Sequence, residues 1–374
     1  MIDKTKLKAE AFSLGFALCG ITTPEPPAHF GAYEAWVNAG RHADMHYLST
    51  ARAKAVRAKP AELLPGCKSI IILGAPYPAP PPITTSNAAQ IAGYAKSTDY
   101  HNVFPPRLEA LAAWITTQAG RPVAWRGFSD TAPILERELA QRAGLGWIGK
   151  NSSLINPQFG SFFLLTELFI DEFIDPDPPF ESNQCSTCSK CINACPTQCI
   201  QNDRTIDASR CLSYLSIENK GPIPPKLRPA MGTRIFGCDT CQTVCPWNGK
   251  IALEAAQTLF PQYHDPDTLS LVKALEMNEN AFRERFRHTP VLRAKRKGFL
   301  RNVAVVLGNM ADPATIPTLT NCLQNESEPL VRTHAAWALG CFHTPEAQIA
   351  LQNALASESD PAVLNEIKAA LESW

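Results

Sequence analysis

Eight of the chain's thirteen cysteines form two similar sets between residues 185 and 245, with a spacing typical of iron–sulfur proteins. The first set is the bacterial ferredoxin run, Cys185-x2-Cys188-x2-Cys191-x3-Cys195-Pro196. The second set is Cys211 followed by Cys238-x2-Cys241-x3-Cys245-Pro246. In such runs two-residue gaps wrap three thiolates around one [4Fe–4S] cluster, and the fourth cysteine ligates the other cluster. The spacing therefore predicts two [4Fe–4S] clusters.

This crossing pattern assigns four ligands to each cluster. Cluster 1 takes Cys185, Cys188, Cys191 and Cys245. Cluster 2 takes Cys195, Cys211, Cys238 and Cys241. Cys199 is left over, and we expect a buried thiol there. Zinc is the alternative metal, but zinc sites favour two Cys-x2-Cys pairs, which three cysteines separated by consecutive two-residue gaps fit poorly.

The composition is that of a neutral globular protein. The chain has 374 residues, enough for two or three domains, and its 35 basic residues balance its 35 acidic ones. Such a molecule has no overall field for nucleic acid or anionic lipid, so any polyanion site must be a local patch. No run reaches transmembrane length and no twin-arginine signal is present. We expect a cytoplasmic monomer with no membrane partner, in a compartment that keeps thiols reduced.

Elements that would position these cysteines are visible on both sides of them. Residues 1–175 predict a mixed α/β domain, with a first helix leading into a strand and a buried strand over 69–74. Helices are expected over 108–117 and 133–143, the second with proline in its first turn, and 162–170 is another apolar run. The proline-rich stretch 221–229 should be an exposed loop.

The C-terminal part is helical and repeats every 32 residues. Val303-Ala-Val-Val-Leu-Gly308 matches Ala335-Ala-Trp-Ala-Leu-Gly340, and Glu328-Pro-Leu-Val331 matches Asp360-Pro-Ala-Val363 at the same offset. This pattern is typical of short HEAT-like repeats, which stack paired helices into a small solenoid. We place the repeats at about 298–374.

A glycine-rich loop is the best candidate for a ligand contact in the first domain. Residues 130–151 contain Gly144, Gly146 and Gly149 within six positions, directly after a predicted helix. Such a loop can bring its backbone close to a flat ligand, and a glycine-rich turn without a ligand is the alternative. No Gly-x-Gly-x-x-Gly fingerprint follows a strand and no P-loop is present, so nucleotide sites of those kinds are unsupported.

Four segments resemble epoxyqueuosine reductases: residues 64–70, the triplet Asp99-Tyr-His101, residues 130–151, and the cysteine pattern ending in Cys238-Asp-x-Cys-Gln-x-Val-Cys-Pro246. The resemblance covers nearly the whole chain. It implies reduction of the epoxide of epoxyqueuosine to queuosine at the wobble position of tRNA, with cobalamin in the first domain. The expected fold class is α+β: an α/β cobalamin-binding domain (1–175), a ferredoxin-like two-cluster module (176–250), and a helical region with HEAT-like repeats (251–374).

The resemblance also implies that Asp130 donates a proton to the departing oxygen. Removing an epoxide oxygen as water requires two electrons, which two clusters can deliver singly to a cobalt centre, and it requires an acid beside that centre. A structural interpretation competes with this role. An aspartate two or three residues before a helical proline is a natural N-cap, worth about 1 kcal/mol.

Further cobalamin contacts follow from the same resemblance. Arg57 would pair with a corrin amide or phosphate, and its alternative is a solvated arginine. His101 is not expected to ligate cobalt, because an open cobalt face suits reduction better. The expected contacts are Arg57, Ser97, Tyr100, Asp130, Gly149, Lys150, Asn151, Ser152, Leu154, Leu165, Ser213 and Asp239.

A local basic stretch provides a possible site for tRNA. Between residues 283 and 301 eight basic residues face one acidic residue, Glu284, and a second positive loop contains Lys220, Lys226, Arg228 and Arg234. Such patches bind phosphates, although a solvated helical face has the same composition. The residues expected to contact the anticodon stem-loop are Lys220, Arg293, Lys295, Arg296 and Lys297.

Two other functions use the same features. A reductive dehalogenase shares cobalamin and two clusters, but the missing twin-arginine signal and the basic repeat region argue against it. A non-catalytic electron carrier or repeat scaffold would leave the first domain unexplained. The enzyme interpretation also requires an external low-potential electron donor.

Overall fold

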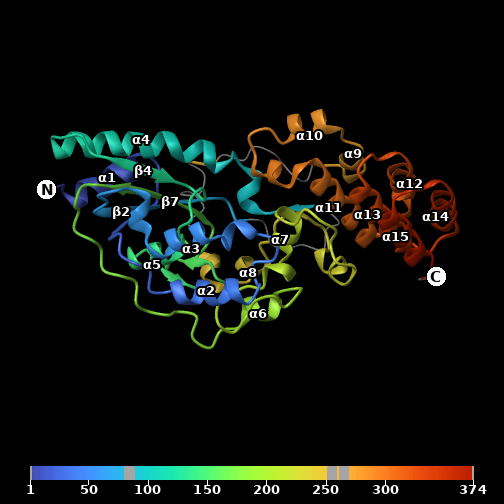
Figure 1. Ribbon diagram of the computed structural model, residues 1–374, viewed down its shortest axis with the longest axis horizontal. Coiled ribbons are helices and arrows are strands. Elements are labelled where there is room, and N and C mark those ends of the chain that lie inside the picture. Colours follow the sequence, from blue (N-terminus) through green and yellow to red (C-terminus); the bar gives the residue numbers. More distant parts are fainter. Residues whose placement is uncertain (1, 80–88, 251–258, 261–268, 373–374) are drawn as a thin grey trace. The chain divides into compact units, whose positions relative to one another are not determined.

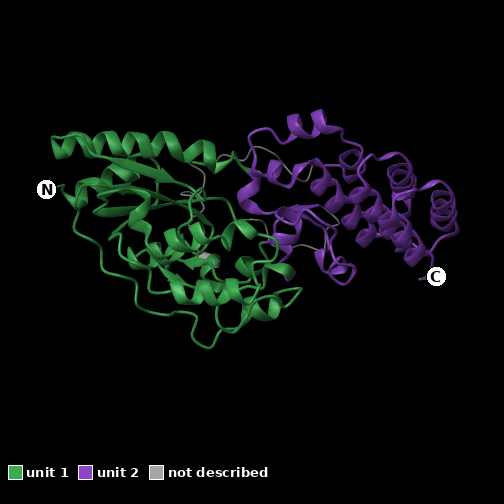
Figure 2. Cartoon of the chain, viewed as in Figure 1, with its two compact units in different colours: residues 1–81, 97–209, 239–262 green, residues 82–96, 210–238, 263–374 purple. Residues whose placement is uncertain are grey.

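The computed structural model describes residues 2–79, 89–250, 259–260 and 269–372, which form two compact units (Figures 1 and 2). Unit 1 comprises residues 1–81, 97–209 and 239–262, and unit 2 comprises residues 82–96, 210–238 and 263–374. Each unit is therefore assembled from separate stretches of the chain. The predicted boundary between the second and third domains, at 250–251, lies at the edge of the described residues.

Unit 1 is built on a four-stranded antiparallel sheet of order β1–β2–β7–β4. Its strands are β1 (Leu18–Thr22), β2 (Ser69–Pro76), β4 (Trp125–Phe128) and β7 (Phe163–Ile170). Every residue of β2 is buried, which confirms the strand predicted at 69–74. Helix α1 (Lys4–Ser13) leads into β1, as the sequence predicts.

Helices cover both faces of this sheet (Figure 1). The twenty-residue α4 (Tyr100–Ala119) contains the helix predicted at 108–117, and its Leu108 packs against Gly127 of β4. Helix α5 (Glu136–Arg142) buries Leu139 against Ile72 and other residues of the opposite face. The remaining elements of unit 1 are α2 (Phe30–Asn38), α3 (Ala51–Ala58), β5 (Trp147–Ile148), β6 (Leu154–Ile155), α6 (Lys190–Ala194) and α8 (Thr240–Thr243).

The start of α5 corrects the sequence-based prediction of a helix over 133–143. The helix begins at Glu136, so Pro133 lies before it rather than in its first turn. The chain leaves β4 through Asp130, whose φ of 57° belongs to the left-handed region, and a right-handed helix cannot start there. Residues 129–135 are therefore a loop that turns the chain back onto the sheet.

Five helices of unit 2 form the repeats. Helices α11 (Lys295–Met310), α13 (Pro329–Gly340) and α15 (Pro361–Glu372) pack side by side, and α12 (Ile316–Asn325) packs on α14 (Pro345–Ser357). A Cβ on Gly308 would lie 2.8 Å from Cα of Ala338, and a Cβ on Gly340 would lie 2.8 Å from Cβ of Ala370. The same close contact recurs 32 residues later, which confirms the predicted repeat.

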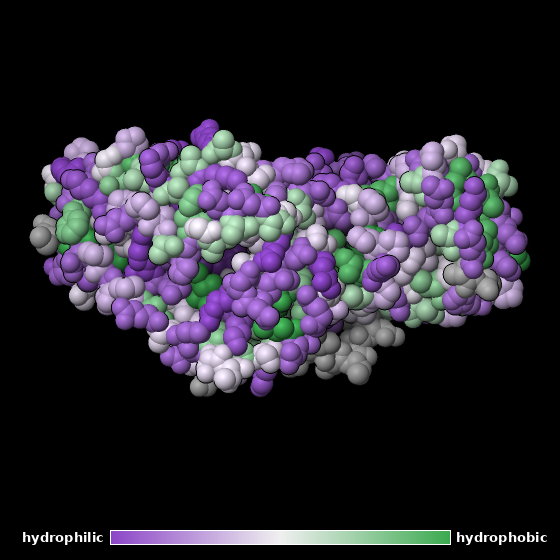
Figure 3. All heavy atoms as spheres, turned by 60° about the horizontal axis from the view of Figure 1, so that its bottom comes forward, coloured by the Kyte–Doolittle hydropathy of each residue, from purple (hydrophilic) through white to green (hydrophobic). Residues whose placement is uncertain are grey.

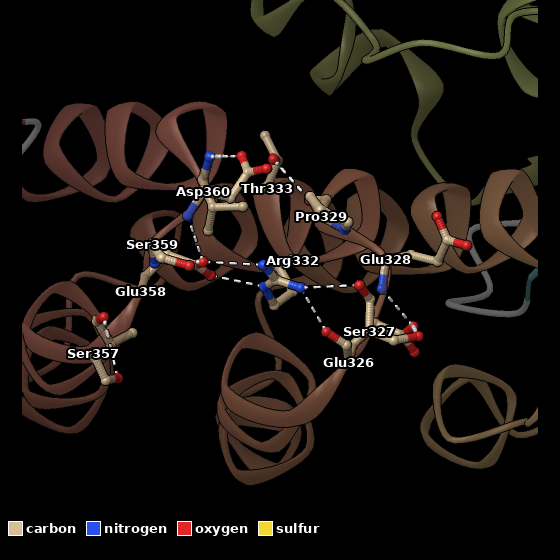
Figure 4. Close-up of polar contacts among 12 residues, drawn as sticks. Glu326, Ser327, Glu328, Pro329, Arg332, Thr333, Ser357, Glu358, Ser359 and Asp360 are labelled. Atoms are coloured by element: carbon tan, nitrogen blue, oxygen red, sulfur yellow. Dashed lines mark hydrogen bonds and ion pairs between the residues drawn. The ribbon is translucent and has the colours of Figure 1, made fainter.

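A salt bridge recurs with the repeat as well. Figure 4 shows the guanidinium of Arg332 donating to both carboxylate oxygens of Glu358, at 2.7 and 3.0 Å, and to the carbonyls of Glu326 and Ser327. These hydrogen bonds lower the pKa of Glu358 to about 2. Arg296 forms the corresponding bidentate pair with Glu326, 32 residues before Glu358. Each glutamate also accepts from the backbone amide two residues ahead, so each pair fastens one repeat junction.

The rest of unit 2 supports the repeats. It comprises β3 (Gln90–Ile91), α7 (Leu212–Ile217), β8 (Arg234–Phe236), α9 (Leu271–Leu275) and α10 (Glu279–Arg285). The predicted exposed loop at 221–229 is confirmed in part: Pro222, Pro224, Pro225, Lys226 and Pro229 are exposed, but Ile223 and Arg228 are buried. Arg228 donates to the carbonyl of Ile223 and to the carboxylate of Glu366, and its guanidinium carbon lies 5.4 Å from the ring centre of Trp337.

The helices in the part of the chain that the structure describes include no candidate membrane span. No helix there is long and apolar enough to cross a bilayer. On the face shown in Figure 3, hydrophilic residues are spread over most of the drawn surface.

Candidate functional site

Asp130 lies on the loop that follows β4, and its neighbours hold it in an unusual conformation. Its backbone has a φ of 57°, and its Oδ2 accepts a hydrogen bond of 3.1 Å from the hydroxyl of Tyr100. Tyr100 is buried at the start of α4, where Asp99 caps the helix by accepting from the amide of His101. Asp130 itself is exposed. The N-cap interpretation is wrong, because the cap of α5 is Leu135.

Two glutamates that the sequence analysis missed belong to the same site. Oε1 of Glu136, the first residue of α5, accepts a hydrogen bond of 3.1 Å from the backbone amide of Asp130. Glu167 is fully buried in β7, and neither of its carboxylate oxygens has a hydrogen-bond partner among the described residues. A single glutamate inside the apolar run 162–170 was the sequence signal that pointed to it.

Both glutamates bind protons more tightly than a solvated carboxylate does. Burial, with the negative charge of Asp130, raises the pKa of Glu136 to about 7. Burial, with the charges of Glu136 and Asp130, raises the pKa of Glu167 well above its ordinary value. At least part of this group is therefore protonated near neutral pH.

Arg57, a further candidate cofactor contact, lies in well-defined surroundings. It is buried on α3, donates to the carbonyl of Ala53, and lies 5.1 Å from the ring centre of Tyr33. The interpretation as a solvated arginine is therefore wrong. Its positive charge also acts on Glu136, which places it on the same side of the molecule as the Asp130 loop.

The glycine-rich loop forms the hairpin of β5 and β6. A Cβ on Gly146 would lie 2.2 Å from the carbonyl of Ile155, and a Cβ on Gly149 would meet the Ile155 side chain at 2.6 Å. Close approach of the protein's own chain therefore explains these glycines. The loop also contacts the cysteine segments, since Lys150 donates to the carbonyls of Ser186 and Cys188, each at 2.8 Å.

The other residues predicted to contact cobalamin are dispersed over both units. Ser97 is buried and donates to the carbonyl of Phe260, and Asn151 is buried and donates to the carbonyl of Cys241. Leu165 packs against the core beneath α5. Of the remainder, Ser152 and Leu154 lie on the hairpin loop and β6, Asp239 directly precedes α8, and Ser213 lies on α7 of unit 2.

The four thiols assigned to cluster 1 lie near one another in unit 1. Burial raises the pKa of Cys191 and Cys245, and charge repulsion from Cys185 raises both further. Cys188 also acts on Cys245, and the indole of Trp147 donates to the sulfur of Cys185 at 3.5 Å. When these neighbouring thiols are ionised, their negative charges repel one another. Bound iron cations would compensate that repulsion, so the four sulfurs form a suitable set of ligands. The residues present therefore fit an iron–sulfur cluster.

The four cysteines assigned to cluster 2 are divided between the two units. Cys195 and Cys241 belong to unit 1, and Cys211 and Cys238 belong to unit 2. Cys199 is buried as predicted, with its sulfur 3.4 Å from that of Cys195.

The basic stretch is only partly available for a ligand. Arg301 is fully buried and donates to the carbonyls of Leu215, Asn219 and Gly221, so its inclusion in a solvated patch was wrong. Arg293, Lys295 and Lys297 are exposed. A cavity of about 870 Å³ in unit 2 is lined by Glu279, Asn280, Phe282, Arg283, Glu284, Arg287, Leu292, Lys295, Arg296, Lys297 and Glu328. Three glutamates in this lining reduce the charge excess that the sequence suggests.

Replacing Arg296 with glutamine is expected to destabilise unit 2. Arg296 and Glu326 are largely buried, and losing their charged hydrogen bonds should lower the free energy of unfolding by about 2 kcal/mol, measured by denaturant titration. Lys297→Gln is the matched control, because Lys297 is exposed and its ion pair with Glu328 is long, at 4.0 Å. Equal stability of the two variants would contradict the structural role of Arg296.

These features define an iron–sulfur oxidoreductase. Family models match the chain in three places: a 4Fe-4S double cluster binding domain at residues 184–248, the epoxyqueuosine reductase QueG model at 57–131, and HEAT repeats at 289–372. An epoxyqueuosine reductase from Pseudomonas aeruginosa is 41% identical over 87% of this chain and 91% of the relative. The chain belongs to the epoxyqueuosine reductase family.

Solved structures agree with this assignment. The crystal structure of an epoxyqueuosine reductase with an epoxyqueuosine-modified tRNA-Tyr stem loop is similar at a TM-score of 0.90 and 28% identity, covering 99% of this chain and 98% of that one. A Bacillus subtilis epoxyqueuosine reductase, solved with its catalytic aspartate loop swung out of the active site, has a TM-score of 0.88 at 28% identity over 99% and 98% of the two chains.

Proposed function

We propose that this protein reduces the epoxide of epoxyqueuosine to queuosine at the wobble position of tRNA, with cobalamin and two [4Fe–4S] clusters, and with Asp130 as the proton donor. The main observation behind this proposal is the exposed carboxyl of Asp130. It accepts a hydrogen bond from Tyr100, and the backbone of Asp130 has a φ of 57°. Support comes from the family and from the Bacillus subtilis relative, whose catalytic aspartate also lies on a loop.

The surroundings of Asp130 suit a cofactor and a nucleoside. The groups that hold Asp130 come from buried or half-buried positions, whereas its own carboxyl is open to solvent. A large ligand with amide and phosphate groups would meet the exposed Asp130 and the positive charge of Arg57, which acts on the neighbouring Glu136. Cobalamin, when bound, supplies reducing electrons at cobalt. The contacts predicted at Arg57, Tyr100 and the hairpin loop are part of this proposal.

Asp130 performs the acid chemistry. The epoxide oxygen gains negative charge as its bond to carbon breaks, and a carboxylic acid within hydrogen-bond distance can protonate it. Tyr100 keeps Oδ2 fixed by donating to it, so the proton is carried on the other oxygen, Oδ1. The backbone amide of Asp130 donates a hydrogen bond to Glu136, which fixes the loop and so orients the carboxyl group of Asp130.

The cysteine segments deliver the electrons. The proposed ligands are Cys185, Cys188, Cys191 and Cys245 for one cluster, and Cys195, Cys211, Cys238 and Cys241 for the other. Lys150 and Asn151 tie the hairpin loop to the carbonyls of Cys188 and Cys241, so the loop and the cysteine segments keep a fixed geometry. An external low-potential donor must supply the two electrons.

The anticodon stem-loop is proposed to bind along the exposed basic side chains of unit 2. Arg293, Lys295 and Lys297 are exposed, and the last two line the cavity near α10. Lys220 lies in the same unit and donates to the carbonyl of Arg293. These contacts would be to phosphates, which position the RNA without reading its sequence. Conversion of an epoxyqueuosine stem-loop to the queuosine form by the reduced protein tests the whole proposal, and an unchanged nucleoside would contradict it.

A further inference from the structure

The buried carboxyl group of Glu167 needs an explanation that the fold does not provide. It lies in the middle of β7, opposite Ile72 of β2 and Phe128 of β4, and residues directly opposite in antiparallel strands share a face. Ile72 and Phe128 both belong to the core beneath α5, so Glu167 points into that core. An apolar residue would pack there without the cost of burying an unpaired carboxyl.

Glu136 connects this buried group to Asp130. Glu136 is the first residue of α5, and one of its oxygens accepts from the Asp130 amide, which leaves the other oxygen for a proton. Glu167 interacts electrostatically with both Glu136 and Asp130. The buried strand, the start of α5 and the exposed loop thus each contribute one carboxyl group to this region, and no direct hydrogen bond joins Glu167 to Glu136.

The reaction needs more protons than Asp130 alone carries. Conversion of an epoxide to an alkene and water consumes two electrons and two protons. The first proton converts the epoxide oxygen to a hydroxyl group as one C–O bond breaks, and the second allows that oxygen to leave as water when the other C–O bond breaks. Asp130 gives up its only proton in the first transfer, so it must be reloaded before the second.

We infer that the half-buried Glu136 and the buried Glu167 form a carboxyl pair that holds a proton and passes it through Glu136 to Asp130 during each turnover. This role rests on the proposed function, with the electrons coming from the external donor through the clusters. Glu136 and Glu167 do not touch the substrate in this scheme and act through Asp130. After the product leaves, the exposed Asp130 recovers protons from solvent and returns one to the pair.

The charges around the pair are consistent with a shared proton. Asp130 and Glu167 face Glu136 with negative charge, whereas Arg137 and Arg57 oppose them with positive charge. The charged groups that act on Glu167 are Glu136 and Asp130, both acidic. Two acids that repel each other, with no base acting on the inner one among the described residues, favour one retained proton.

The pair gives the stability of the protein a pH dependence that can be measured without any cofactor. Because the folded chain holds these protons more tightly than the unfolded chain, protonation favours folding. For Glu136 this contribution is complete below its ordinary pKa of 4.5 and is lost as the pH rises through about 7. Glu167 acts in the same direction.

The test compares wild type with Glu136→Gln, Glu167→Gln, the double variant, and Glu109→Gln, an exposed control on α4. Glutamine keeps the acceptor for the Asp130 amide but cannot deliver a proton. The expected results are a roughly tenfold lower kcat with little change in KM for both single variants. The wild-type decline in kcat above about pH 7 should be absent in Glu136→Gln, whose pH profile should be flat. Glu136→Leu, which also removes the acceptor, should lose more activity than Glu136→Gln.

The second readout is the free energy of unfolding between pH 4.5 and 8, measured on the purified chain. Wild type and Glu109→Gln should lose stability as the pH rises, and the two glutamine variants should lose less, with non-additive effects in the double variant. Unchanged pH profiles for both activity and stability in the two variants would overturn the carboxyl pair. A wild type that shows the stability slope but makes no queuosine would instead overturn the proposed function, and the relay role with it.

Discussion

Asp130→Asn is expected to lower turnover of epoxyqueuosine in tRNA by about a thousandfold while the protein stays folded. Asparagine has nearly the same shape and can still accept the hydrogen bond that Tyr100 donates to Oδ2. The backbone of residue 130 also tolerates the change, because asparagine adopts a φ near 57° more readily than most residues. The variant loses only the transferable proton. The measurement is the rate of queuosine formation under single-turnover conditions, with iron and corrinoid content determined on the same sample.

Asp175→Asn is the matched control for this experiment. Asp175 is an exposed aspartate of the same unit, paired on the surface with Lys4. Its replacement should leave turnover within about twofold of wild type, because exposed ion pairs contribute little. Normal turnover by Asp130→Asn would remove Asp130 as the proton donor, and the function of the loop would need another explanation.

Cys245→Ala is expected to remove one cluster although Cys245 lies 54 positions beyond the nearest of its proposed co-ligands in sequence order. Those co-ligands are Cys185, Cys188 and Cys191, and Cys245 lies within reach of their charges in unit 1. Iron content should fall from about eight to about four atoms per chain. Queuosine formation should stop, because electrons then lack one step of the relay. Iron analysis and electron paramagnetic resonance of the anaerobic protein measure the result.

Cys199→Ala distinguishes the crossing pattern from a local alternative. Cys199 is buried with its sulfur 3.4 Å from that of Cys195, which makes it the nearest competing thiol. If the assignment is right, this variant keeps about eight iron atoms. Full iron content in Cys245→Ala, or loss of a cluster in Cys199→Ala, would require a different ligand set.

Local spacing made the cysteine segments and the repeats predictable from sequence. Ligand runs and helical repeats are short-range patterns, so the 32-residue repeat could be predicted from the sequence, and the structure shows it in the contact of Gly308 with Ala338 and its recurrence at Gly340. The buried strand at 69–74 was predictable for the same reason, since residues 70–73 are a run of isoleucine and leucine.

The site around Asp130 was not predictable in this way. The left-handed conformation of Asp130 and the late start of α5 depend on how the loop returns to the sheet. Glu167 is remote in sequence and comes near Asp130 only through the pairing of β7 with β4. Its position in an apolar run was a usable signal, because an isolated charge in a buried strand seldom lacks a role.

Charge counting along the sequence failed for a related reason. Arg301 and Arg228 read as basic surface residues, yet both are buried and satisfy backbone carbonyls. Arg296 binds Glu326 at one repeat junction, and Arg332 binds Glu358 at the next. A guanidinium has five donors in a fixed geometry, which suits it to such structural sites as well as to phosphates.

The central claim is that this chain deoxygenates epoxyqueuosine in tRNA with a corrinoid and its own clusters. The most direct measurement incubates the anaerobically reduced protein with an epoxyqueuosine-containing anticodon stem-loop, with and without added cobalamin, and determines nucleoside masses. We expect loss of one oxygen atom from the modified nucleoside only when cobalamin is present, and no loss with Asp130→Asn. An unchanged nucleoside with cobalamin-loaded, cluster-replete protein would contradict the proposed function, and equal conversion without cobalamin would contradict the role of the cofactor.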